Sequence, residues 1–298
     1  MPYETLLYDT ADAVATITLN RAQRLNTIVP PMPDEIEAAV HRAIADERVK
    51  VIVLRGAGRS FCAGFDFGDG FHHWDEALTS DGAWDAGKDF VFATAPSVAP
   101  VPKFMSLWRS PKPVIAQIHG WCVGGGSDMA LCADLVIASE DARIGTSYSR
   151  MWGCYLTGMW LYRLGLTKAK EYALSGKPLS GREAADVGLI NAAVPFAELE
   201  AEVARRAGQL ASIPLSQLSA MKLVVNQVIS SEELRSLVGC LSSALSELES
   251  RVLSLYLDGY SYEQVGERLD CDTKTVDNAL QRVKRKVGAH LQARAVAA

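Results

Sequence analysis

Residues 115–133, which read IAQIHGWCVGGGSDMALCA, carry the pattern that decides the fold of this chain. The apolar run that begins at Val114 predicts a buried strand, and three consecutive glycines follow it at positions 124–126. The next residues, up to Leu131, are typical of a helix start. A strand, a glycine turn and a helix N-terminus leave backbone N–H groups directed at one point, where they can stabilise an anion or a developing oxyanion. Asp128 lies one turn inside that helix and is the candidate acid–base group.

The composition is that of a folded protein with an ample core. A length of 298 residues predicts one large domain or two unequal ones, and 49% of the residues are hydrophobic. The net charge of −5 argues against nucleic-acid binding by the whole chain, although it leaves room for a basic module at one end. Six cysteines without CxxC spacing indicate buried thiols in a reducing compartment. Because we find neither a signal peptide nor a membrane-spanning run, we expect a soluble, cytoplasmic protein.

Periodicity along the chain predicts alternating strands and helices. Strands are expected at 3–8, 14–19, 49–55, 114–118, 134–138 and 142–145, and helices at 33–46, 99–108, 168–175, 180–187, 196–211 and 215–229. Residues 65–84 show no period, which predicts an irregular lid or substrate loop. The histidines and aspartates of this loop lack metal-ligand spacing, so we expect a polar lid and no metal. Its aromatic residues are candidates for the wall of an acyl pocket or for the core: Phe67, Phe71, Trp74 and Trp84.

A second glycine turn follows the strand predicted at 49–55. It contains Cys62, Ala63 and Gly64, and like the first turn it comes directly after a strand. Both turns can therefore lie at the same edge of one sheet. A thioester carbonyl that becomes an enolate needs two convergent N–H donors, and two such turns can supply them. The alternative interpretation of the glycines is a tight turn or close helix packing.

Four ordered blocks carry a resemblance to a known family. They read NRAQRLNTI at 20–28, SFCAGFDF at 60–67, IAQIHGWCVGGGSDMALCADLVIAS at 115–139 and LTKAKEYALSGKPLSGREAADVGLINAAVP at 166–195. In this order and spacing, they resemble the enoyl-CoA hydratase/isomerase (crotonase) family over about residues 3–230. The resemblance implies an α/β fold, a spiral of repeated β-β-α turns, and assembly as trimers or pairs of trimers. It also implies an acyl-CoA substrate, with coenzyme A as part of the substrate and no separate cofactor.

The resemblance also implies roles for individual residues. The N–H groups of Ala63 and Gly125 would form the oxyanion hole, and Arg21 and Arg24 would meet the phosphates of CoA. The remaining implied contacts, to the adenine and the pantetheine, belong to Leu25, Ala63 and Asp66. For either arginine, the alternative is a solvated surface charge.

The chain departs from the family at the catalytic carboxylates. Enoyl-CoA hydratases use two glutamates to hold and split a water; here Asp128 stands at the first position, one methylene shorter. The second position falls on Tyr148 or Ser149, and neither is a carboxylate. A tyrosine is a poor base near neutral pH, so we expect inefficient hydration. Isomerisation, decarboxylation and C–C or thioester hydrolysis remain open, with Asp128 as the acid–base group and Tyr148 as its partner. Alternatively, Asp128 only interacts with the helix dipole.

The last part of the chain has a different character. A serine-rich stretch precedes it, so we expect domains at 1–240 and 241–298. Ser261 and Gln264 form a capping-box pair, and Thr273 is expected to cap a last helix that runs to residue 287. A short helix, a tight turn and a longer helix predict a helix-turn-helix.

This segment resembles region four of bacterial sigma factors, which implies promoter DNA as a partner. Thr273, Lys274 and Asn278 would then face bases. The residues that would meet phosphates are Arg282, Lys284, Arg285 and Lys286. The alternative is a helical pair that packs on the enzyme body. Two hypotheses follow for the whole chain: an acyl-CoA enzyme with an appended helical module, or an acyl-CoA-sensing DNA-binding regulator with an inactive crotonase body.

Overall fold

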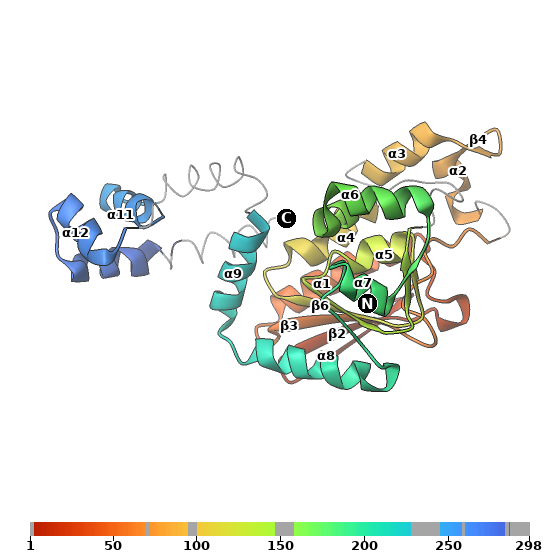
Figure 1. Cartoon of the computed structure of the whole chain (residues 1–298), viewed down its shortest axis with the longest axis horizontal. Helices are drawn as coiled ribbons and strands as arrows, with labels where there is room; N and C mark the ends of the chain where they lie inside the picture. Colours follow the sequence, from red (N-terminus) through yellow and green to blue (C-terminus); the bar gives the residue numbers. More distant parts are fainter. Residues whose placement is uncertain are drawn as a thin grey trace. The chain divides into compact units, whose positions relative to one another are not determined.

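The computed structural model of this chain describes residues 3–68, 72–94, 100–146, 158–227, 245–257, 260–283 and 286 (Figure 1). It divides into two compact units, Met1–Leu218 and Ser219–Ala298. The domain boundary predicted near residue 240 falls in the segment 228–244, outside the described residues. Among the described helices, none combines the length and the apolar character needed to cross a bilayer.

The first unit is built on a six-stranded sheet in the order β1-β2-β3-β6-β8-β11. Its strands are Leu6–Ala11, Val14–Leu19, Val51–Gly56, Val114–Ile118, Leu135–Ser139 and Ala192–Val194. β1 and β2 form an antiparallel hairpin, and the other neighbours run parallel. A second sheet has the order β10-β9-β7, from Leu179–Ser180, Arg143–Gly145 and Trp121–Val123. Parallel pairing demands crossover connections, and the helices supply them.

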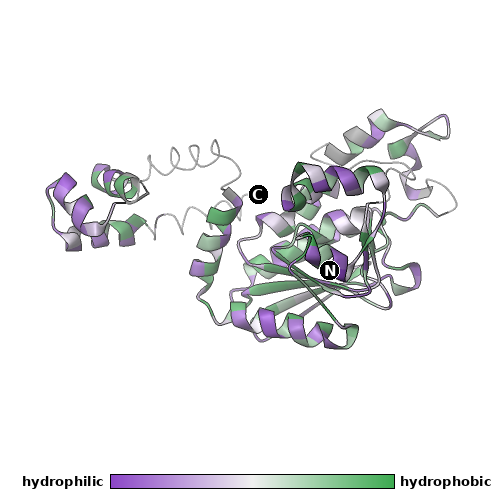
Figure 2. Ribbon diagram, viewed as in Figure 1, coloured by the Kyte–Doolittle hydropathy of each residue, from purple (hydrophilic) through white to green (hydrophobic). Residues whose placement is uncertain are grey.

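Helices cover both faces of the large sheet, which explains the continuous apolar runs of its central strands. Val51, Val53 and Ile115 pack with the buried side of α8 (Phe196–Ala211). Their neighbours in sequence, such as Ile52 and Leu54, belong to the core on the opposite face. That core also takes in α1 (Pro31–Ala45) and α4 (Pro100–Arg109). Figure 2 shows the same arrangement, with green strands and an α8 striped in both colours.

Successive turns of the chain repeat a strand-strand-helix unit. β6 of the large sheet continues into β7 of the small sheet and then into α5 (Gly125–Ala130). β8 and β9 repeat the step before α6 (Met159–Ser175). One turn earlier, β3 is followed by Cys62, which forms a parallel bridge with Cys122 of β7. This repeat confirms the predicted α/β spiral of β-β-α turns.

The observed elements differ from the predicted ones in four places. β1 lies three residues later than the strand predicted at 3–8, α6 begins at Met159 rather than at residue 168, and the short strands and the lid also differ. β7 and β11 are three residues long, and periodicity cannot identify a strand of that length. Residues 65–84 are not wholly irregular, because the structure places several short elements in and just after this stretch. They are η2 (His72–Trp74), α2 (Asp75–Leu78), β4 (Thr79–Ser80), β5 (Ala83–Trp84) and α3 (Ala86–Thr94). Two further helices are α7 (Gly181–Asp186), which belongs to the first unit, and α9 (Leu215–Gln227), which contains the boundary between the two units at residue 218.

The C-terminal segment contains α11 (Glu247–Leu257), α12 (Tyr262–Leu269) and a helix at 273–283. The predicted capping box of Ser261 and Gln264 is present at α12. The cap of the last helix differs from the prediction: Asp272, not Thr273, accepts a hydrogen bond from the Thr275 N–H at 2.6 Å. Asp272 stands one residue before Thr273, in the N-cap position, and aspartate is a better N-cap residue than threonine because its carboxylate accepts a hydrogen bond from a free N–H of the first turn. α12, its turn and this helix form the predicted helix-turn-helix.

Candidate functional site

The two glycine turns meet through a shared segment, residues 62–66. On one side, Cys62 pairs with β7: its N–H donates to the Trp121 carbonyl at 2.9 Å, and the Val123 N–H donates to its carbonyl at 3.1 Å. On the other side, the Ile28 N–H donates to the Gly64 carbonyl at 2.8 Å. The segment therefore lies between residues 25–28 and 121–124, and it joins the sequence blocks at 20–28 and 115–139.

Close approach at Gly64 brings the turns together. Gly64 has φ +91°, which favours glycine, and a Cβ at this position would lie 3.1 Å from the Val123 carbonyl oxygen and 3.9 Å from the Gly125 nitrogen. A Cβ on Gly126 would lie only 2.5 Å from the Cys62 carbonyl oxygen. Glycine is thus required on both turns by the contact between them. The sequence prediction that both turns lie at one edge agrees with this contact.

The backbone donors at this contact are those of Phe65 and Gly125. Ile28 pairs with the Gly64 carbonyl and the Asp66 N–H, so the N–H of Phe65 between them points to the opposite side. Gly125 is the first residue of α5, where an N–H has no intrahelical acceptor. Within the described residues, neither N–H donates to a backbone carbonyl.

The structure differs from the prediction at Ala63. The Ala63 N–H donates to the carbonyl of Leu25 at 3.0 Å, so it is already used inside the protein. The carbonyl of Leu25 is available for this bond because Leu25 has a left-handed conformation, with φ +53°. Two residues along the chain, Phe65 offers the donor that the sequence prediction had placed on Ala63. No signal in the sequence distinguishes the two, because both follow the same glycine-rich turn.

Asp128 lies inside the protein at the same turn. It is fully buried, and its N–H donates to the carbonyl of Gly124 at 3.1 Å. Asp128 is three residues after Gly125, so the two residues share one face of α5. Ser127 beside it accepts a hydrogen bond from the indole N–H of Trp160 at 3.2 Å, which anchors α5 to α6. The two candidates for the second catalytic position, Tyr148 and Ser149, lie outside the described residues.

Asp66 forms ion pairs with both arginines that were predicted to bind CoA, Arg21 and Arg24. Its carboxylate is 4% exposed and lies 3.0 Å from both Arg21 and Arg24. Burial opposes the charge, but hydrogen bonds from Arg24, Thr27 and Arg21 outweigh it and hold the pKa of Asp66 well below its usual range. Arg21 also donates to the Thr27 carbonyl, whereas Arg24 remains about half exposed. Arg21 therefore holds the 21–27 turn, and Arg24 keeps an accessible guanidinium. Neither arginine is a purely solvated charge.

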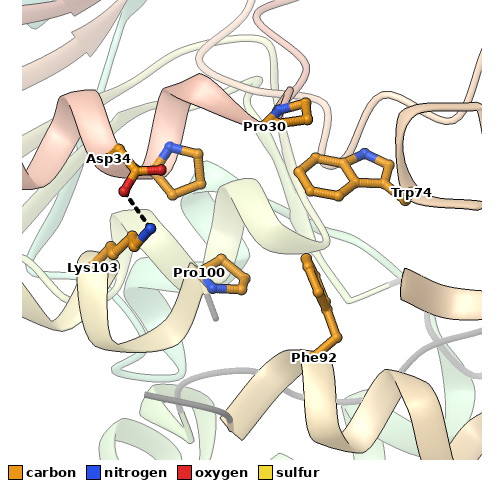
Figure 3. Close-up of a pocket in the computed structure, with 7 residues that line it drawn as sticks. Pro30, Asp34, Trp74, Phe92, Pro100 and Lys103 are labelled. Atoms are coloured by element: carbon orange, nitrogen blue, oxygen red, sulfur yellow. Dashed lines mark hydrogen bonds and ion pairs between the residues drawn. The ribbon is translucent and has the colours of Figure 1, made fainter. Parts of the chain in front are cut away.

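Aromatic rings form a cluster beside the turns. The Phe65 ring contacts Trp74, with centroids 5.3 Å apart, and Phe92, at 6.2 Å. A Cβ on Gly125 would meet the edge of the Phe65 ring at 2.5 Å, so this ring packs directly on the glycine turn. Trp74 and Phe92 line a pocket, as Figure 3 shows. The sequence predicts Trp74 as a residue of a pocket wall or of the core. It does not predict Phe92, which lies in α3, outside the loop at 65–84. Trp84 is 39% exposed, and Phe71 lies outside the described residues.

In the C-terminal segment, one face of the last helix is exposed. Thr273, Lys274 and Asn278 are all exposed, as the DNA-binding prediction requires, and Gln281 extends the same face by one turn. The other face, which includes Val276, is buried in a small core together with Val252 of α11 and Val265 of α12.

The predicted phosphate contacts are less available. Arg282 and Lys286 both bind the buried Glu249 of α11, at 3.0 and 2.6 Å. Hydrogen bonds from Lys286, the Ser246 N–H and Arg282 lower the pKa of Glu249 to about 2. These two cations hold the helices together, and because their side chains stay 42% and 40% exposed, the contact with phosphates stays a prediction. Lys284 and Arg285 lie outside the described residues.

Metal binding has no support in the described part of the chain, where no group of three histidine, cysteine, aspartate or glutamate side chains could hold an ion. Two of the cysteines lie beside the turns. Cys62 and Cys122 are buried, and burial raises the pKa of the Cys62 thiol to about 12. Both thiols are therefore unreactive packing groups at neutral pH.

Comparison with known proteins agrees with this architecture. The model of the family described as enoyl-CoA hydratase/isomerase matches residues 9–239, and that of sigma-70 region 4 matches residues 235–287. A probable enoyl-CoA hydratase of Rhodobacter capsulatus is 33% identical over 225 residues, which cover 74% of this chain and 81% of the relative. A hydroxycinnamoyl-CoA hydratase-lyase of Pseudomonas fluorescens is 28% identical, with coverage of 66% and 69%. The crystal structure of an enoyl-CoA hydratase from Mycobacterium smegmatis is 37% identical with a TM-score of 0.69, covering 78% of this chain and 80% of the other. The spiral of β-β-α turns, the paired glycine turns and these matches place the chain in the enoyl-CoA hydratase/isomerase family.

Proposed function

We propose that this protein is an acyl-CoA enzyme that works through a thioester enolate bound by the N–H groups of Phe65 and Gly125. The observation that carries the proposal is the contact between the two glycine turns, which brings a Cβ position on Gly64 to 3.9 Å from the Gly125 nitrogen. Two fixed donors on opposite turns stabilise a charge that develops on the thioester oxygen, at no cost of reorganisation.

Asp128 is the group that moves the proton. Its carboxylate takes a proton from the carbon next to the thioester carbonyl. The electron pair of that C–H bond forms the C=C bond of the enolate, and the negative charge passes to the oxygen between the two N–H donors. Asp128 shares the α5 face of Gly125, so base and oxyanion donor are carried by one rigid element. Return of the proton to another carbon would complete an isomerisation.

Efficient hydration is not part of the proposal. Asp128 is the carboxylate at the first catalytic position, and the second position, Tyr148 or Ser149, carries none. A hydratase needs one group to activate water and one to protonate the adduct. A single carboxylate suits reactions in which one group removes and returns a proton, such as double-bond isomerisation. The expected assembly as a trimer or a pair of trimers stays a prediction.

Exchange of the α-proton tests this function without knowledge of the final reaction. The protein should catalyse deuterium incorporation at the α-carbon of butyryl-CoA in D₂O, followed by NMR or mass spectrometry. Because an enolate is the only intermediate required, exchange occurs even if the acyl group is not the natural one. Lack of exchange with a panel of CoA thioesters that bind would contradict the enolate mechanism. It would favour the alternative of an acyl-CoA-sensing regulator with an inactive body.

DNA binding by the C-terminal segment is a second candidate function. It is favoured by the exposed face of the last helix, with Thr273, Lys274 and Asn278, together with the sigma-70 region 4 match. Arg282 and Lys286 also pair with Glu249, and their side chains stay 42% and 40% exposed. Because each cation that contacts a phosphate adds to the salt dependence of the affinity, the slope of that dependence measures how many such contacts form.

Fluorescence anisotropy with a labelled duplex that contains a promoter −35 element tests this second function. At low salt, the full chain should bind, and Lys274→Ala should weaken binding by about ten-fold, since one base contact contributes about 1–3 kcal/mol. Glu263→Ala, an exposed change on α12 that removes no cation, is the control. If Lys274→Ala binds like the wild type, or no binding is seen at low salt, the exposed face does not read DNA.

A further inference from the structure

The pocket beside the glycine turns has the size for a substituted ring. It encloses about 330 Å³ and is lined by Pro30, Pro33, Asp34, Trp74, Phe92, Pro100 and Lys103. A cavity of about 150 Å³ holds one benzene molecule, so this pocket has room for an aromatic ring with a substituent and a linker. Its volume falls in the range of small-molecule sites.

The pocket is separated from the oxyanion donors by one aromatic ring. Phe65, whose N–H is one donor, contacts both Trp74 and Phe92 with its own ring. Ile28 pairs with Phe65, and Pro30, two residues further on, lines the pocket. Two residues of extended chain span at most about 7 Å, so the pocket wall at Pro30 lies near the backbone segment that carries Phe65.

The walls of the pocket are flat and rigid. Trp74 and Phe92 meet edge to face, with centroids 5.4 Å apart and planes at 64°. Pro30 and Pro100 lie across from them, and Figure 3 shows all four rings around one space. Aromatic rings pack best against other rings in edge-to-face or offset geometry. A flexible alkyl chain would lose rotamer freedom in this pocket and gain no such geometry.

One side of the pocket is polar. Asp34 of α1 and Lys103 of α4 form an ion pair there, and the Lys103 side chain is only 13% exposed. A ligand carboxylate would be repelled by Asp34, and a ligand cation by Lys103. A neutral hydroxyl avoids both penalties, because it can accept from the ammonium and donate to the carboxylate.

We propose that this pocket receives the acyl part of the substrate and selects an aromatic ring that carries a hydroxyl group, which Asp34 and Lys103 bind together. This assignment rests on the proposed function, since the thioester of the same molecule must reach Phe65 and Gly125. It identifies the substrate class as hydroxyaryl-CoA thioesters, and it makes Lys103 and Asp34 the specificity-determining residues.

Calorimetric binding to the full chain tests the assignment without relying on turnover. The probes are 4-hydroxycinnamoyl-CoA, cinnamoyl-CoA and crotonyl-CoA. We expect 4-hydroxycinnamoyl-CoA to bind about ten-fold more tightly than cinnamoyl-CoA, because a hydrogen bond to a charged group is worth about a factor of ten or more. Crotonyl-CoA should bind more weakly than both.

Variants separate the pocket from the reaction. Lys103→Met should remove the preference for the hydroxyl over the unsubstituted ring, and Asp34→Asn should reduce that preference. Lys168→Met breaks an exposed Lys–Glu pair on α6 and should leave the preference intact. If all three thioesters bind equally, or if Lys103→Met keeps the preference, the assignment is wrong even when the α-proton exchange succeeds. If no thioester binds at all, the proposed function itself fails.

Discussion

Replacing Asp128 by asparagine is expected to lower the rate of α-proton exchange by about 10²–10⁴-fold, the range attributed to a positioned general acid–base group. The amide keeps the size of the carboxylate but cannot take up a proton. Because Asp128 shares the α5 face of Gly125 and carries no oxyanion donor, the affinity for a CoA thioester should change little. The measurement is deuterium exchange under saturating butyryl-CoA, together with its dissociation constant.

Two further variants make this result decisive. Asp186→Asn changes an exposed aspartate at the end of α7 and should exchange like the wild type. Asp128→Glu adds one methylene to a fully buried side chain and introduces the carboxylate that hydratases have there. If Asp128→Asn exchanges at the wild-type rate, Asp128 is a packing residue at the start of α5, and another group moves the proton.

Replacing Gly126 by alanine is expected to destabilise the first unit by about 1–3 kcal/mol and to abolish exchange. The added Cβ would lie 2.5 Å from the carbonyl oxygen of Cys62 and 2.9 Å from its sulfur, and a backbone atom cannot rotate away. The two turns must then separate, which moves the Phe65 and Gly125 donors apart. The melting temperature should fall by several degrees, at about 2–4 °C per kcal/mol for a unit of this size.

Tryptophan fluorescence follows this transition selectively, because all six tryptophans lie between residues 74 and 160. Gly208→Ala is the matched control. Gly208 lies in α8, and a Cβ there meets nothing within 4 Å, so alanine should stabilise the helix by about 1 kcal/mol. A Gly126→Ala protein that melts and exchanges like the wild type would show that the contact between the turns is not needed for the site.

At the glycine turn near Asp128, the residue pattern predicted the secondary structure but not which backbone N–H groups are free. Residues 114–126 predicted a strand, a glycine turn and a helix, and the structure contains β6, β7 and α5 there. The pattern also led to the second turn at residues 62–64. It could not identify the donor, because the choice between Ala63 and Phe65 depends on which side of the segment Leu25 and Ile28 occupy. That arrangement is a long-range pairing, which local spacing does not encode.

The basic cluster of the C-terminal segment shows the same limit. Four of the five residues at 282–286 are Arg or Lys, and a cluster of this kind predicts phosphate contacts if its side chains are assumed to face solvent. In the structure, Glu249, more than 30 residues earlier in the chain, binds Arg282 and Lys286. The exposed Thr273, Lys274 and Asn278 follow from helical periodicity alone and agree with the prediction. The periodicity of a helix can be predicted from the sequence, whereas the ion-pair partner of a charged side chain cannot.

The sequence by itself determined the helix-turn-helix and the position of Asp128 at the glycine turn, because both depend on residue types at short, regular spacing. The spiral α/β fold and the family followed from the resemblance of four ordered blocks to that family. Only the tertiary structure decided that Phe65 rather than Ala63 has the free N–H group beside Gly125, that Arg21 and Arg24 converge on Asp66, and that Phe92 joins Trp74 around a pocket. The physical reason is common to all three. Each is either the orientation of one backbone group or a contact between residues distant in the sequence, such as Arg24 and Asp66, which are 42 positions apart. Such contacts arise from packing of the whole unit rather than from any local preference.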